Sequence, residues 1–293
     1  MSPEIRVAVC TNRRPEQAAD CLRALARQVD PDRIAVVTSG LPGELVERHR
    51  AASPGTVLAE PRAGLSHARN RALAWCGAGD VVVFVDDDAV PREGWHAALE
   101  AAWAEAADDV ACIGGPIHPR WAAPRPPWLA DEMLPALTVL DLGAQRLRLD
   151  PEVTAVFGAN VSFRAAPLRA AGGFDPSYGH RGDRTFFGEE DQAQRALARL
   201  GFGTVYDPGP VVDHLVPPGR ATRAAVLRRR FGYGAALGMR GGRGPGAALA
   251  GGLRSAAGCV TAAAGRREEL MMLRAYRVAE NAGVLLGPLV LRH

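Results

Sequence analysis

The stretch DVVVFVDDD, residues 80–88, decides the fold and points to the chemistry. Its first part is almost continuously apolar, the pattern of a central strand buried on both faces of a parallel sheet. Asp86, Asp87 and Asp88 follow at once, at the strand end where ligands bind in open parallel sheets. Three adjacent carboxylates repel one another, and a divalent cation, Mn2+ or Mg2+, is a natural partner for them. The alternative is an acidic start to a helix that begins near Pro91.

The sequence on either side of this stretch alternates between apolar runs and helical periodicity. Strands are expected at residues 5–10, 33–38, 56–60 and 110–114, and helices from Pro15, over 43–51, from a cap at Ser66 to Cys76, and over 91–107. This alternation predicts a mainly parallel sheet with helices on both faces.

The alternation stops near residue 115. Residues 116–135 are rich in proline and tryptophan and are expected to form an ordered loop or lid. Trp121 and Trp128 in this segment either stack on an acceptor or pack around the prolines. Further on we expect a strand over 153–163, a helix at 164–171, a helix at 188–200, strands at 204–206 and 211–214, a basic helix at 221–236, and a linker or mobile segment at 239–254.

Composition excludes several mechanisms. The chain has 293 residues and no lysine, so a Schiff-base lysine and a P-loop lysine are both impossible. Residues 217–293 hold 13 arginines against three acidic residues, a charge of +10, whereas residues 1–216 hold 22 arginines against 29 acidic residues, a charge of −7. We therefore expect a body over 1–216, with halves at about 1–115 and 116–216, and a basic, mostly helical extension over 217–293. Such an extension suits an anionic partner or forms a solvated helical face.

Cysteine usage and hydropathy bear on location. The five cysteines are scattered without a metal-binding spacing, which is typical of reduced, intracellular thiols. The first ten residues contain no signal-peptide core, and no uncharged apolar run approaches the ~20 residues that a membrane span needs. The two longest such runs, residues 255–265 and 281–291, are read either as buried helices or as segments lying on a membrane surface. We expect a cytoplasmic protein, peripheral at the membrane if these segments bind lipid.

Three further groups of residues carry chemistry. Residues 64–70, GLSHARN, lie between a strand and a helix, and a helix N-terminus with arginine suits a phosphate or nucleotide. Glu189, Glu190 and Asp191 either complement a helix dipole or supply a general base. His214 is either a structural histidine or a neutral imidazole ligand to the proposed cation, and Asp213 either orients its ring or faces water.

Together and in this order, these features resemble the inverting glycosyltransferases of family 2, which have the GT-A fold, over roughly residues 5–235. The segments that carry the resemblance are residues 7–15 (VAVCTNRRP), residues 64–70, the aspartates 86–88, residues 158–164 (GANVSFR), residues 172–175 (GGFD) and the pair Glu190-Asp191. The resemblance implies a mixed, mainly parallel α/β sheet and transfer of a sugar from a nucleotide-diphosphate sugar, with a UDP-sugar favoured, to a hydroxyl or amine.

The resemblance also implies roles for individual residues. Asp86 would contact the ribose side of the donor, Asp88 and His214 would bind the metal, and Asp191 would be the base, with Glu189 or Glu190 as alternatives. Residues 36–40 stand where relatives often carry an acid that contacts the nucleotide base, and the hydroxyl of Thr38 or of Ser39, or backbone groups, would substitute for that acid. The other donor contacts would be Thr11, Asn12, Arg13, Gly64, Arg69 and Asp87, and the acceptor side would include Asn160, Gly173 and Phe174 together with Trp121 and Trp128.

The acceptor is a natural product, a carrier-bound group or a lipid-linked group, and the basic extension would contact a membrane or form a homodimer. Two other functions are alternatives to sugar transfer. A nucleotidyltransferase on a similar fold usually has a glycine-rich first loop, which residues 10–15 lack. A non-catalytic nucleotide-sugar-binding protein would not need the acidic and histidine set. Nucleic acid is not expected as a partner, because few aromatic residues interleave with the basic ones.

Overall fold

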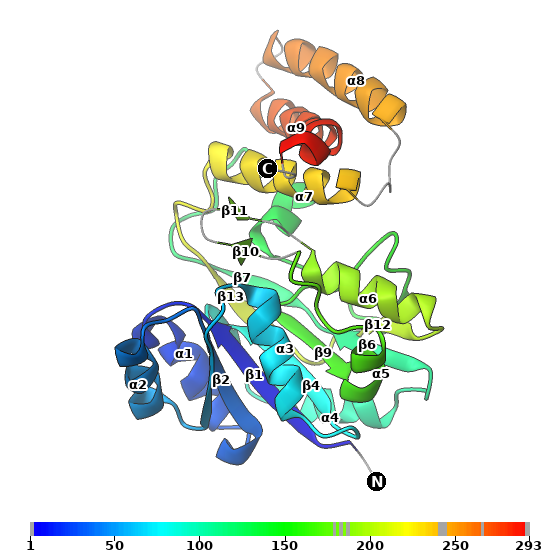
Figure 1. Cartoon of the computed structure of the whole chain (residues 1–293). Coiled ribbons are helices and arrows are strands. Elements are labelled where there is room, and N and C mark those ends of the chain that lie inside the picture. The colour runs from blue at the N-terminus through cyan, green and yellow to red at the C-terminus, as the bar shows by residue number, and fades with distance from the viewer. Residues whose placement is uncertain are drawn as a thin grey trace. The chain divides into compact units, whose positions relative to one another are not determined.

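Eight strands form the central sheet, in the order β3-β2-β1-β4-β9-β6-β12-β8 (Figure 1). The structure, a computed structural model, describes residues 3–177, 180–181, 184–185, 188–239, 245–264 and 267–290. The strands of this sheet are β1 (Ile5–Thr11), β2 (Ile34–Ser39), β3 (Thr56–Glu60), β4 (Val81–Asp86), β6 (Val110–Gly114), β8 (Leu147–Leu149), β9 (Asn160–Arg164) and β12 (Gly203–Tyr206).

The sheet is mixed and mainly parallel, as predicted. Strands β3, β2, β1 and β4 run parallel to one another, and β6 runs parallel to β12. Strand β9 is antiparallel to both β4 and β6, and β8 is antiparallel to β12. The uninterrupted βα alternation of the first 115 residues indicated the parallel part, while the reversal at β9 lies beyond it.

The chain divides into two compact units. The first comprises Met1–Pro119, Leu140–Asp183 and Glu189–His214, and the second Arg120–Val139, Arg184–Gly188 and Leu215–His293. The helices of the first unit are α1 (Pro15–Ala26), η1 (Pro31–Arg33), α2 (Gly43–Ala52), α3 (Leu65–Trp75), α4 (Trp95–Ala104), α5 (Ala165–Ala170) and α6 (Glu189–Arg199). Those of the second are η2 (Asp131–Leu137), α7 (Arg223–Met239), α8 (Pro245–Ala264) and α9 (Glu268–Val290). Among the described residues, the strands outside the central sheet are β5 (Ala89–Pro91), β7 (Ile117–Trp121), β10 (His180–Arg181), β11 (Arg184–Thr185) and β13 (Val212–Val216). No helix among the described residues has the length and apolar character to cross a membrane.

Several local predictions were wrong. The helix expected over 91–107 begins only at Trp95, because residues 89–91 form β5 and pair with β13. The strand expected over 153–163 is confined to β9, and Val153 is exposed. The segment 116–135 contains β7 and the start of η2, and the expected linker at 239–254 becomes helix α8 from Pro245 onward, with residues 240–244 outside the described part.

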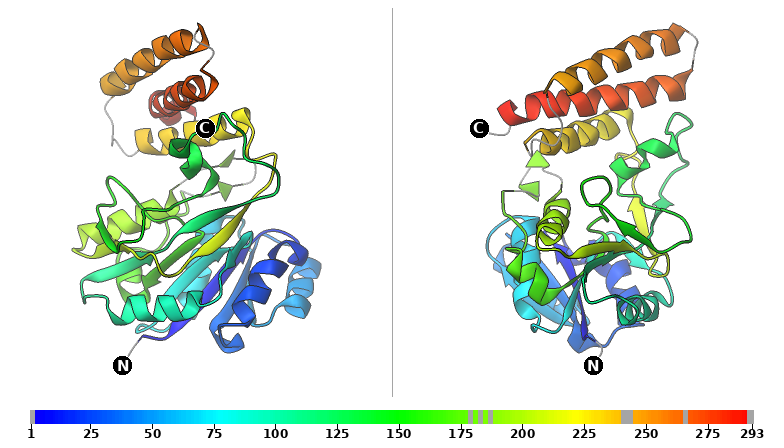
Figure 2. Two further views of the ribbon diagram at one scale, coloured as in Figure 1. Left: turned by 180° about the vertical axis from the view of Figure 1, so that it is seen from behind. Right: turned by 90° about the vertical axis from the view of Figure 1, so that its right-hand side faces the viewer.

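Helices cover both faces of the central sheet, and alternate residues of β9 make contacts on opposite faces. On one face, Asn160 and Ser162 accept hydrogen bonds from the indole nitrogens of Trp95 and Trp103 on α4, both at 3.0 Å. On the other face, Phe163 packs edge-to-face with Phe84 and Phe174. Figures 1 and 2 show α3 and α4 on opposite sides of the sheet. The period of two in a strand therefore lets one short element anchor both layers.

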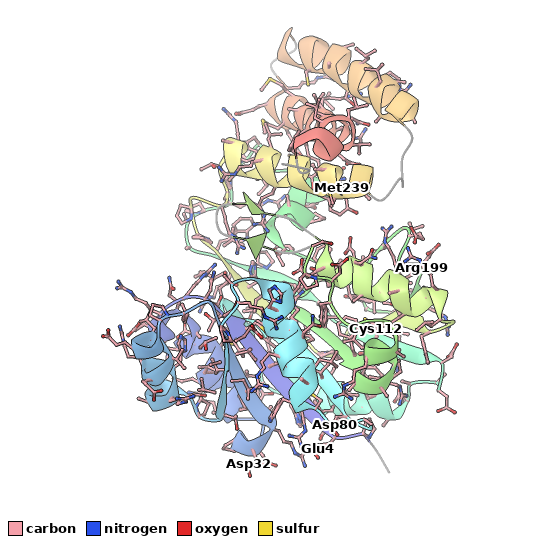
Figure 3. The ribbon with its side chains drawn as sticks, in the orientation of Figure 1. Glu4, Asp32, Asp80, Cys112, Arg199 and Met239 are labelled. Atoms are coloured by element: carbon pink, nitrogen blue, oxygen red, sulfur yellow. The ribbon has the colours of Figure 1, made fainter. Side chains whose placement is uncertain are left out.

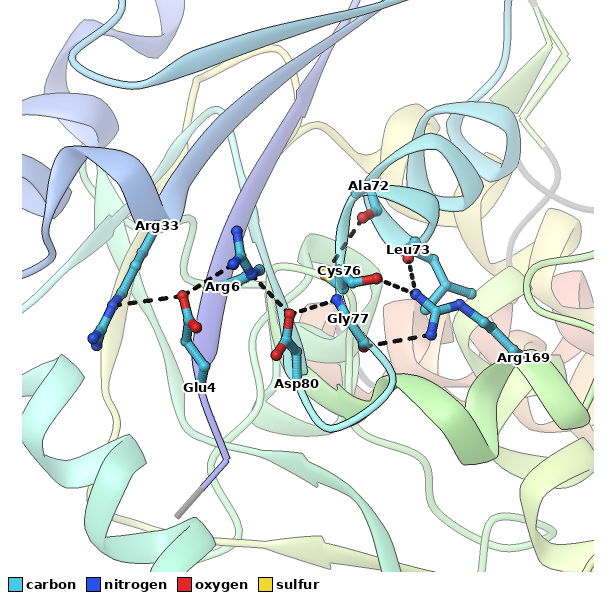
Figure 4. A network of polar contacts seen from close by, with 9 residues as sticks. All are labelled: Glu4, Arg6, Arg33, Ala72, Leu73, Cys76, Gly77, Asp80 and Arg169. Atoms are coloured by element: carbon cyan, nitrogen blue, oxygen red, sulfur yellow. Dashed lines mark hydrogen bonds and ion pairs between the residues drawn. The ribbon is translucent and has the colours of Figure 1, made fainter. Parts of the chain in front are cut away.

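The edge of the sheet at the amino ends of β1 and β4 is closed by ion pairs. Glu4, Asp32 and Asp80 mark this edge in Figure 3. Asp80 accepts hydrogen bonds from Arg6 Nε at 2.7 Å and from the Gly77 backbone nitrogen at 2.5 Å, as Figure 4 shows. In the same network Arg169 donates to the backbone oxygens at the end of α3. These contacts fix the α3–β4 connection at the edge opposite Asp86.

In the second unit, α9 packs against α7 through facing glycines. A Cβ at Gly234 would lie 2.1 Å from the Glu280 backbone oxygen, and a Cβ at Gly283 would lie 2.1 Å from the Phe231 backbone oxygen. Gly238 and Gly287 meet the opposite helix as closely. At these four positions the backbones of α7 and α9 lie so close together that there is no room for a side chain in place of the glycine hydrogen.

Arg230 crosses the same α7–α9 interface. Its guanidinium lies 4.8 and 4.6 Å from the ring centroids of Tyr233 and Tyr276 and pairs with Glu280. The helix packing is thus pinned by a cation between two rings as well as by the glycines.

We expect Gly283→Ala to destabilise the second unit by roughly 1–3 kcal/mol, because the added methyl overpacks a backbone contact. Gly252→Ala is the matched control: it lies in α8, where a Cβ makes only an ordinary contact at 3.5 Å, so better helix propensity should stabilise by about 0.5–1 kcal/mol. Urea unfolding of both variants measures the difference. Equal effects of the two substitutions would contradict this account of the α7–α9 contact.

Candidate active site

The carboxyl ends of three parallel strands bring the predicted donor-side residues together. In the sheet register Thr11 at the end of β1 lies opposite Thr38 on β2, and Cys10 lies opposite Asp86 at the end of β4. Residues far apart in the sequence therefore meet at one edge, as the buried-strand pattern predicted.

A possible cation site lies at this edge. Asp86, Asp88 and His214 each offer a ligand atom, and these atoms all lie within 4.8 Å of one another. His214 reaches Asp88 because β13 pairs antiparallel with β5, which places His214 opposite Ala89. His214 is fully buried, and its Nε2 lies 3.2 Å from Asp88 Oδ1.

The chemistry of this donor set fits a divalent cation. Carboxylates suit Mg2+ and Mn2+, and an imidazole is a ligand that transition metals accept readily. Asp88 and His214, the two residues that the resemblance assigns to a metal, lie together in this group. The structure adds Asp86, which the resemblance put on the ribose side, to the same group.

The environment of Asp86 is unfavourable to its negative charge. Burial, followed by the charge of Asp88, raises the pKa of Asp86 to about 6. A bound cation would offset both effects, since it supplies positive charge where the two carboxylates meet.

Asp87 contacts the loop after β1 instead of joining this group. Its Oδ2 accepts a hydrogen bond from Thr11 Oγ1 at 2.6 Å, and Arg13 Nη1 lies 3.6 Å from both Asp87 Oδ1 and Asp88 Oδ2. The backbone nitrogen of Arg13 in turn donates to Thr11 Oγ1. The β1 loop is thereby tied to the aspartates, and Asn12 lies exposed in it. Asp213 pairs with Arg92 at 2.6 Å, so it neither orients the ring of His214 nor simply faces water.

The loop before α3 depends on backbone geometry. The N-cap of α3 is Gly64, with a φ of 135°, and Ser66 lies buried inside the helix, so the predicted cap at Ser66 was wrong. Ser39 Oγ accepts a hydrogen bond from the Gly64 nitrogen at 2.9 Å, which ties this loop to β2. The Thr38 hydroxyl is buried and has no hydrogen-bond partner among the described residues.

The acidic group at the start of α6 surrounds a buried arginine. Arg69 Nη1 donates to Glu189 Oε1 at 2.9 Å and lies 3.5 Å from Glu190 Oε2. Arg69 is only 2% exposed, so the predicted donor contact is replaced by one inside the protein. Burial, followed by the charge of Glu190, raises the pKa of Glu189 above its usual range, while Arg69 acts in the opposite direction. Asp191, the next residue, is also buried.

Two of the predicted acceptor-side residues have structural contacts. Asn160 accepts from Trp95 and donates to the backbone oxygens of Pro116 and Pro210, so its amide is occupied inside the protein. The ring of Phe174 is buried in the aromatic cluster, and its backbone exchanges two hydrogen bonds with the Asn70 side chain. Both residues hold the site's framework and do not present a surface to an acceptor. Gly173 has a φ of 69°, which favours glycine.

The two predicted tryptophans belong to the second unit. Trp128 is buried in its hydrophobic core, with Arg223 placed 5.8 Å from the ring centroid, and Trp121 packs partly buried against the same cluster. Trp128 is thus a packing residue in this structure, which was one of the two alternatives for it.

Sequence reasoning missed two residues that shape the site. A Cβ at Gly158 would lie 2.0 Å from Arg69 Nη2, so glycine is required there while the guanidinium keeps its position. Gln194, fully buried on α6, accepts from the Val156 nitrogen at 3.0 Å and donates to the Val156 oxygen at 2.9 Å. A polar residue one turn after the acidic group was the available signal for Gln194. Gly158 opens the segment GANVSFR that the resemblance singled out, but the sequence did not show its contact with Arg69.

We expect the isolated protein to bind Mn2+, and Asp88→Asn or His214→Ala to weaken this binding by at least about tenfold, since loss of even a supporting contact in metal sites costs about 10–100-fold. Isothermal titration with MnCl2 measures it. Asp213→Asn is the control, because Asp213 is next to His214 in the sequence but pairs with Arg92. The affinity of this variant for Mn2+ should equal that of the unaltered protein. Equal affinity in Asp88→Asn would refute the site.

Comparison with known proteins agrees with this geometry. The family model "Glycosyltransferase like family 2" matches residues 3–234. The glucosyl-dolichyl phosphate glucuronosyltransferase of Haloferax volcanii is 29% identical over 153 residues, which cover 52% of this chain and 47% of that protein, so the match spans about half the relative's length.

Two solved structures show the same fold. A mannosyltransferase of Pyrobaculum calidifontis, in complex with GDP-Man and Mn2+, has a TM-score of 0.62 at 20% identity, over 97% of this chain and 88% of its own. GalNAc-T7 with UDP, GalNAc and Mn2+ has a TM-score of 0.54 at 14% identity, over 80% and 51%. The family match confirms the resemblance drawn from the sequence and the expectation of a glycosyltransferase with a GT-A fold: the chain belongs to the glycosyltransferase-like family 2.

Proposed function

We propose that the protein transfers a sugar, with inversion, from a nucleotide-diphosphate sugar to an acceptor hydroxyl or amine in a reaction that depends on Mn2+ or Mg2+. One observation carries this proposal: Asp86, Asp88 and His214 gather within 4.8 Å at the carboxyl edge of the sheet in a member of this family. That group suits a cation that binds the donor's diphosphate.

The donor would lie along the ends of β1, β2 and β4. Thr38 would offer its buried hydroxyl to the nucleotide base, and Arg13, already beside Asp87 and Asp88, is an arginine within reach of a diphosphate. A bound cation would neutralise charge that develops on the leaving diphosphate. The family resemblance favours a UDP-sugar as the donor. GDP-sugars are the second choice, because GalNAc-T7 was solved with UDP but the mannosyltransferase with GDP-Man.

Asp191 is our candidate for the general base. The family resemblance puts the base at this position, and the contacts of Glu189 and Glu190 with Arg69 give those two carboxylates a different task. In the reaction Asp191 takes the proton from the acceptor, the acceptor oxygen or nitrogen forms a bond to the anomeric carbon, and the bond from that carbon to the diphosphate oxygen breaks. A single displacement inverts the anomeric carbon.

We expect Asp191→Asn to lower transfer by about 10²–10⁴-fold, the usual contribution of a positioned base, while binding of UDP or GDP with Mn2+ is unchanged. A screen of UDP- and GDP-sugars, followed by rates on the best donor and titration of the nucleotide, measures both quantities. Transfer that survives in Asp191→Asn would show that the base is misassigned. Release of pyrophosphate from a nucleoside triphosphate and a sugar phosphate would instead identify a nucleotidyltransferase, and tight donor binding without turnover a binding protein.

The acceptor and the second unit are linked in our proposal to an anionic membrane surface. Leu249 and Leu253, one turn apart on α8, are 53% and 64% exposed, and Arg254 adjoins them. Residues 217–293 carry a charge of +10. Each leucine that enters lipid contributes about 1.5–3 kcal/mol, and each arginine near an anionic surface about 1 kcal/mol. The H. volcanii relative is named for a dolichyl phosphate substrate, which supports a lipid-linked acceptor.

We expect Leu249→Glu/Leu253→Glu to reduce sedimentation with phosphatidylglycerol vesicles by about tenfold or more, since both apolar contacts are lost and negative charge is added. Leu200→Glu is the matched control, because Leu200 is a 50% exposed leucine of the first unit. Neutral phosphatidylcholine vesicles should bind the unaltered protein weakly. Equal binding of the double variant, or a loss of dimer instead of a loss of vesicle binding, would contradict the membrane role.

A further inference from the structure

We propose that Arg69 is a positioning residue for the general base, acting through Glu189 and Glu190 from inside the protein. This inference rests on the proposed function, since it takes Asp191 as the base. It differs from a role in donor binding, which the sequence alone had suggested for Arg69.

The burial of Arg69 carries the first step. Its side chain, on α3, is 2% exposed, and its guanidinium carbon lies 5.5 Å from the ring centroids of both Phe84 and Phe174. A guanidinium tolerates such a place because it is planar and weakly hydrated, but an uncompensated buried charge is costly. Glu189 supplies the compensation with an Oε1 that lies 2.9 Å from Arg69 Nη1.

The surrounding backbone is shaped to the same guanidinium. Gly158, just before β9, leaves the space that a Cβ would take from Arg69 Nη2 at 2.0 Å. The Gly158 nitrogen donates to Glu190 Oε1 at 3.2 Å, while the other oxygen of Glu190 lies 3.5 Å from Arg69 Nη1. The carboxylate of Glu190 thus bridges the loop before β9 and the arginine of α3.

The start of α6 is therefore held from two sides. Arg69 holds it toward α3, and the loop before β9 holds it through Gly158 on Glu190 and Val156 on Gln194. Asp191 follows Glu190 directly, so the contacts of its two predecessors set its position and the rotation of the first helical turn.

Charge balance explains why the base depends on this arginine. Glu189 and Glu190 are adjacent carboxylates that repel each other, and the charge of Glu190 adds to burial in raising the pKa of Glu189. Arg69 lies between their carboxylates and offsets that repulsion. Without it, two neighbouring acids in a buried first turn would move apart or take up protons, and Asp191 would shift with them. A displacement near 1 Å at a reacting group costs about 10²-fold in rate.

The decisive experiment separates turnover from donor affinity. Arg69→Met keeps the length and apolar stem of the side chain but removes the cation. We expect its kcat for the best donor to fall by about 10²-fold while the Kd for UDP or GDP with Mn2+ changes less than about threefold. The double variant Arg69→Met/Glu189→Gln, which removes one of the two repelling charges as well, should recover part of the loss. Tenfold weaker binding of the nucleotide in Arg69→Met, with kcat retained, would overturn the inference and make Arg69 a donor ligand.

A second measurement does not need turnover. Hydrogen exchange in the peptide 188–195 should quicken in Arg69→Met, whereas Phe163→Leu, a substitution in the same aromatic cluster, should leave that peptide unchanged when the two variants are compared at equal distance from their Tm. Unchanged exchange in Arg69→Met would also overturn the inference. If Arg69→Met fails to fold, Arg69→Lys, which keeps the charge but not the planar fork, takes its place with the same expected pattern and a loss of about tenfold or more.

Failure of this inference is distinguishable from failure of the proposed function. An unaltered protein that turns over no nucleotide sugar contradicts the proposed function, and the exchange measurement still decides whether Arg69 holds α6. An active unaltered protein whose Arg69→Met variant loses only donor affinity contradicts the role of Arg69 alone.

Discussion

Acidic side chains crowd the carboxyl edge of the central sheet, and their mutual repulsion must be offset for the fold and the site to exist together. Three lie at the end of β4, where Asp86 is the last residue of the strand and Asp87 and Asp88 follow it, and three open α6, at residues 189–191. Different side chains offset the negative charge of each acidic group. Arg13 and the Thr11 hydroxyl meet Asp87, His214 meets Asp88, and Arg69 meets the glutamates of α6. With no lysine in the chain, arginine and histidine provide all of the side-chain cations available for this purpose.

The positive charge of Arg69 is permanent, whereas a divalent cation bound near Asp86 could come and go. Arg69 is buried beside the rings of Phe84 and Phe174 and is a fixed part of the chain, so its contacts hold the acids of α6 in one arrangement. The group of Asp86, Asp88 and His214 has positions that a divalent cation can take. In the proposed reaction the fixed arginine serves the acceptor side, where the base must stay in place, and the exchangeable cation serves the donor side, where a diphosphate comes and goes.

The second unit is stabilised by different means. Its helices α7 and α9 approach at glycines and share Arg230, which lies between Tyr233 and Tyr276. Close backbone packing buries area without large side chains, so a segment poor in bulky residues still forms a helical layer. The leucines of α8 are left exposed by this arrangement. Positive charge concentrates in the same part of the chain, and the proposed lipid surface suits both properties.

By itself the sequence determined the parallel half of the sheet and the identity of the acidic groups, because a buried strand is a local apolar run and its carboxyl end follows directly. It did not determine that β9 runs antiparallel, that β5 and β13 pair, or that α8 is a helix. The glycines of α8 lower helix propensity and resemble a linker until a partner helix is present. Nor could it decide which way Arg69 points, since a donor phosphate and a buried glutamate attract a guanidinium equally well. Only the tertiary structure settles that choice, because the acids of α6 and the gap at Gly158 come from distant parts of the chain.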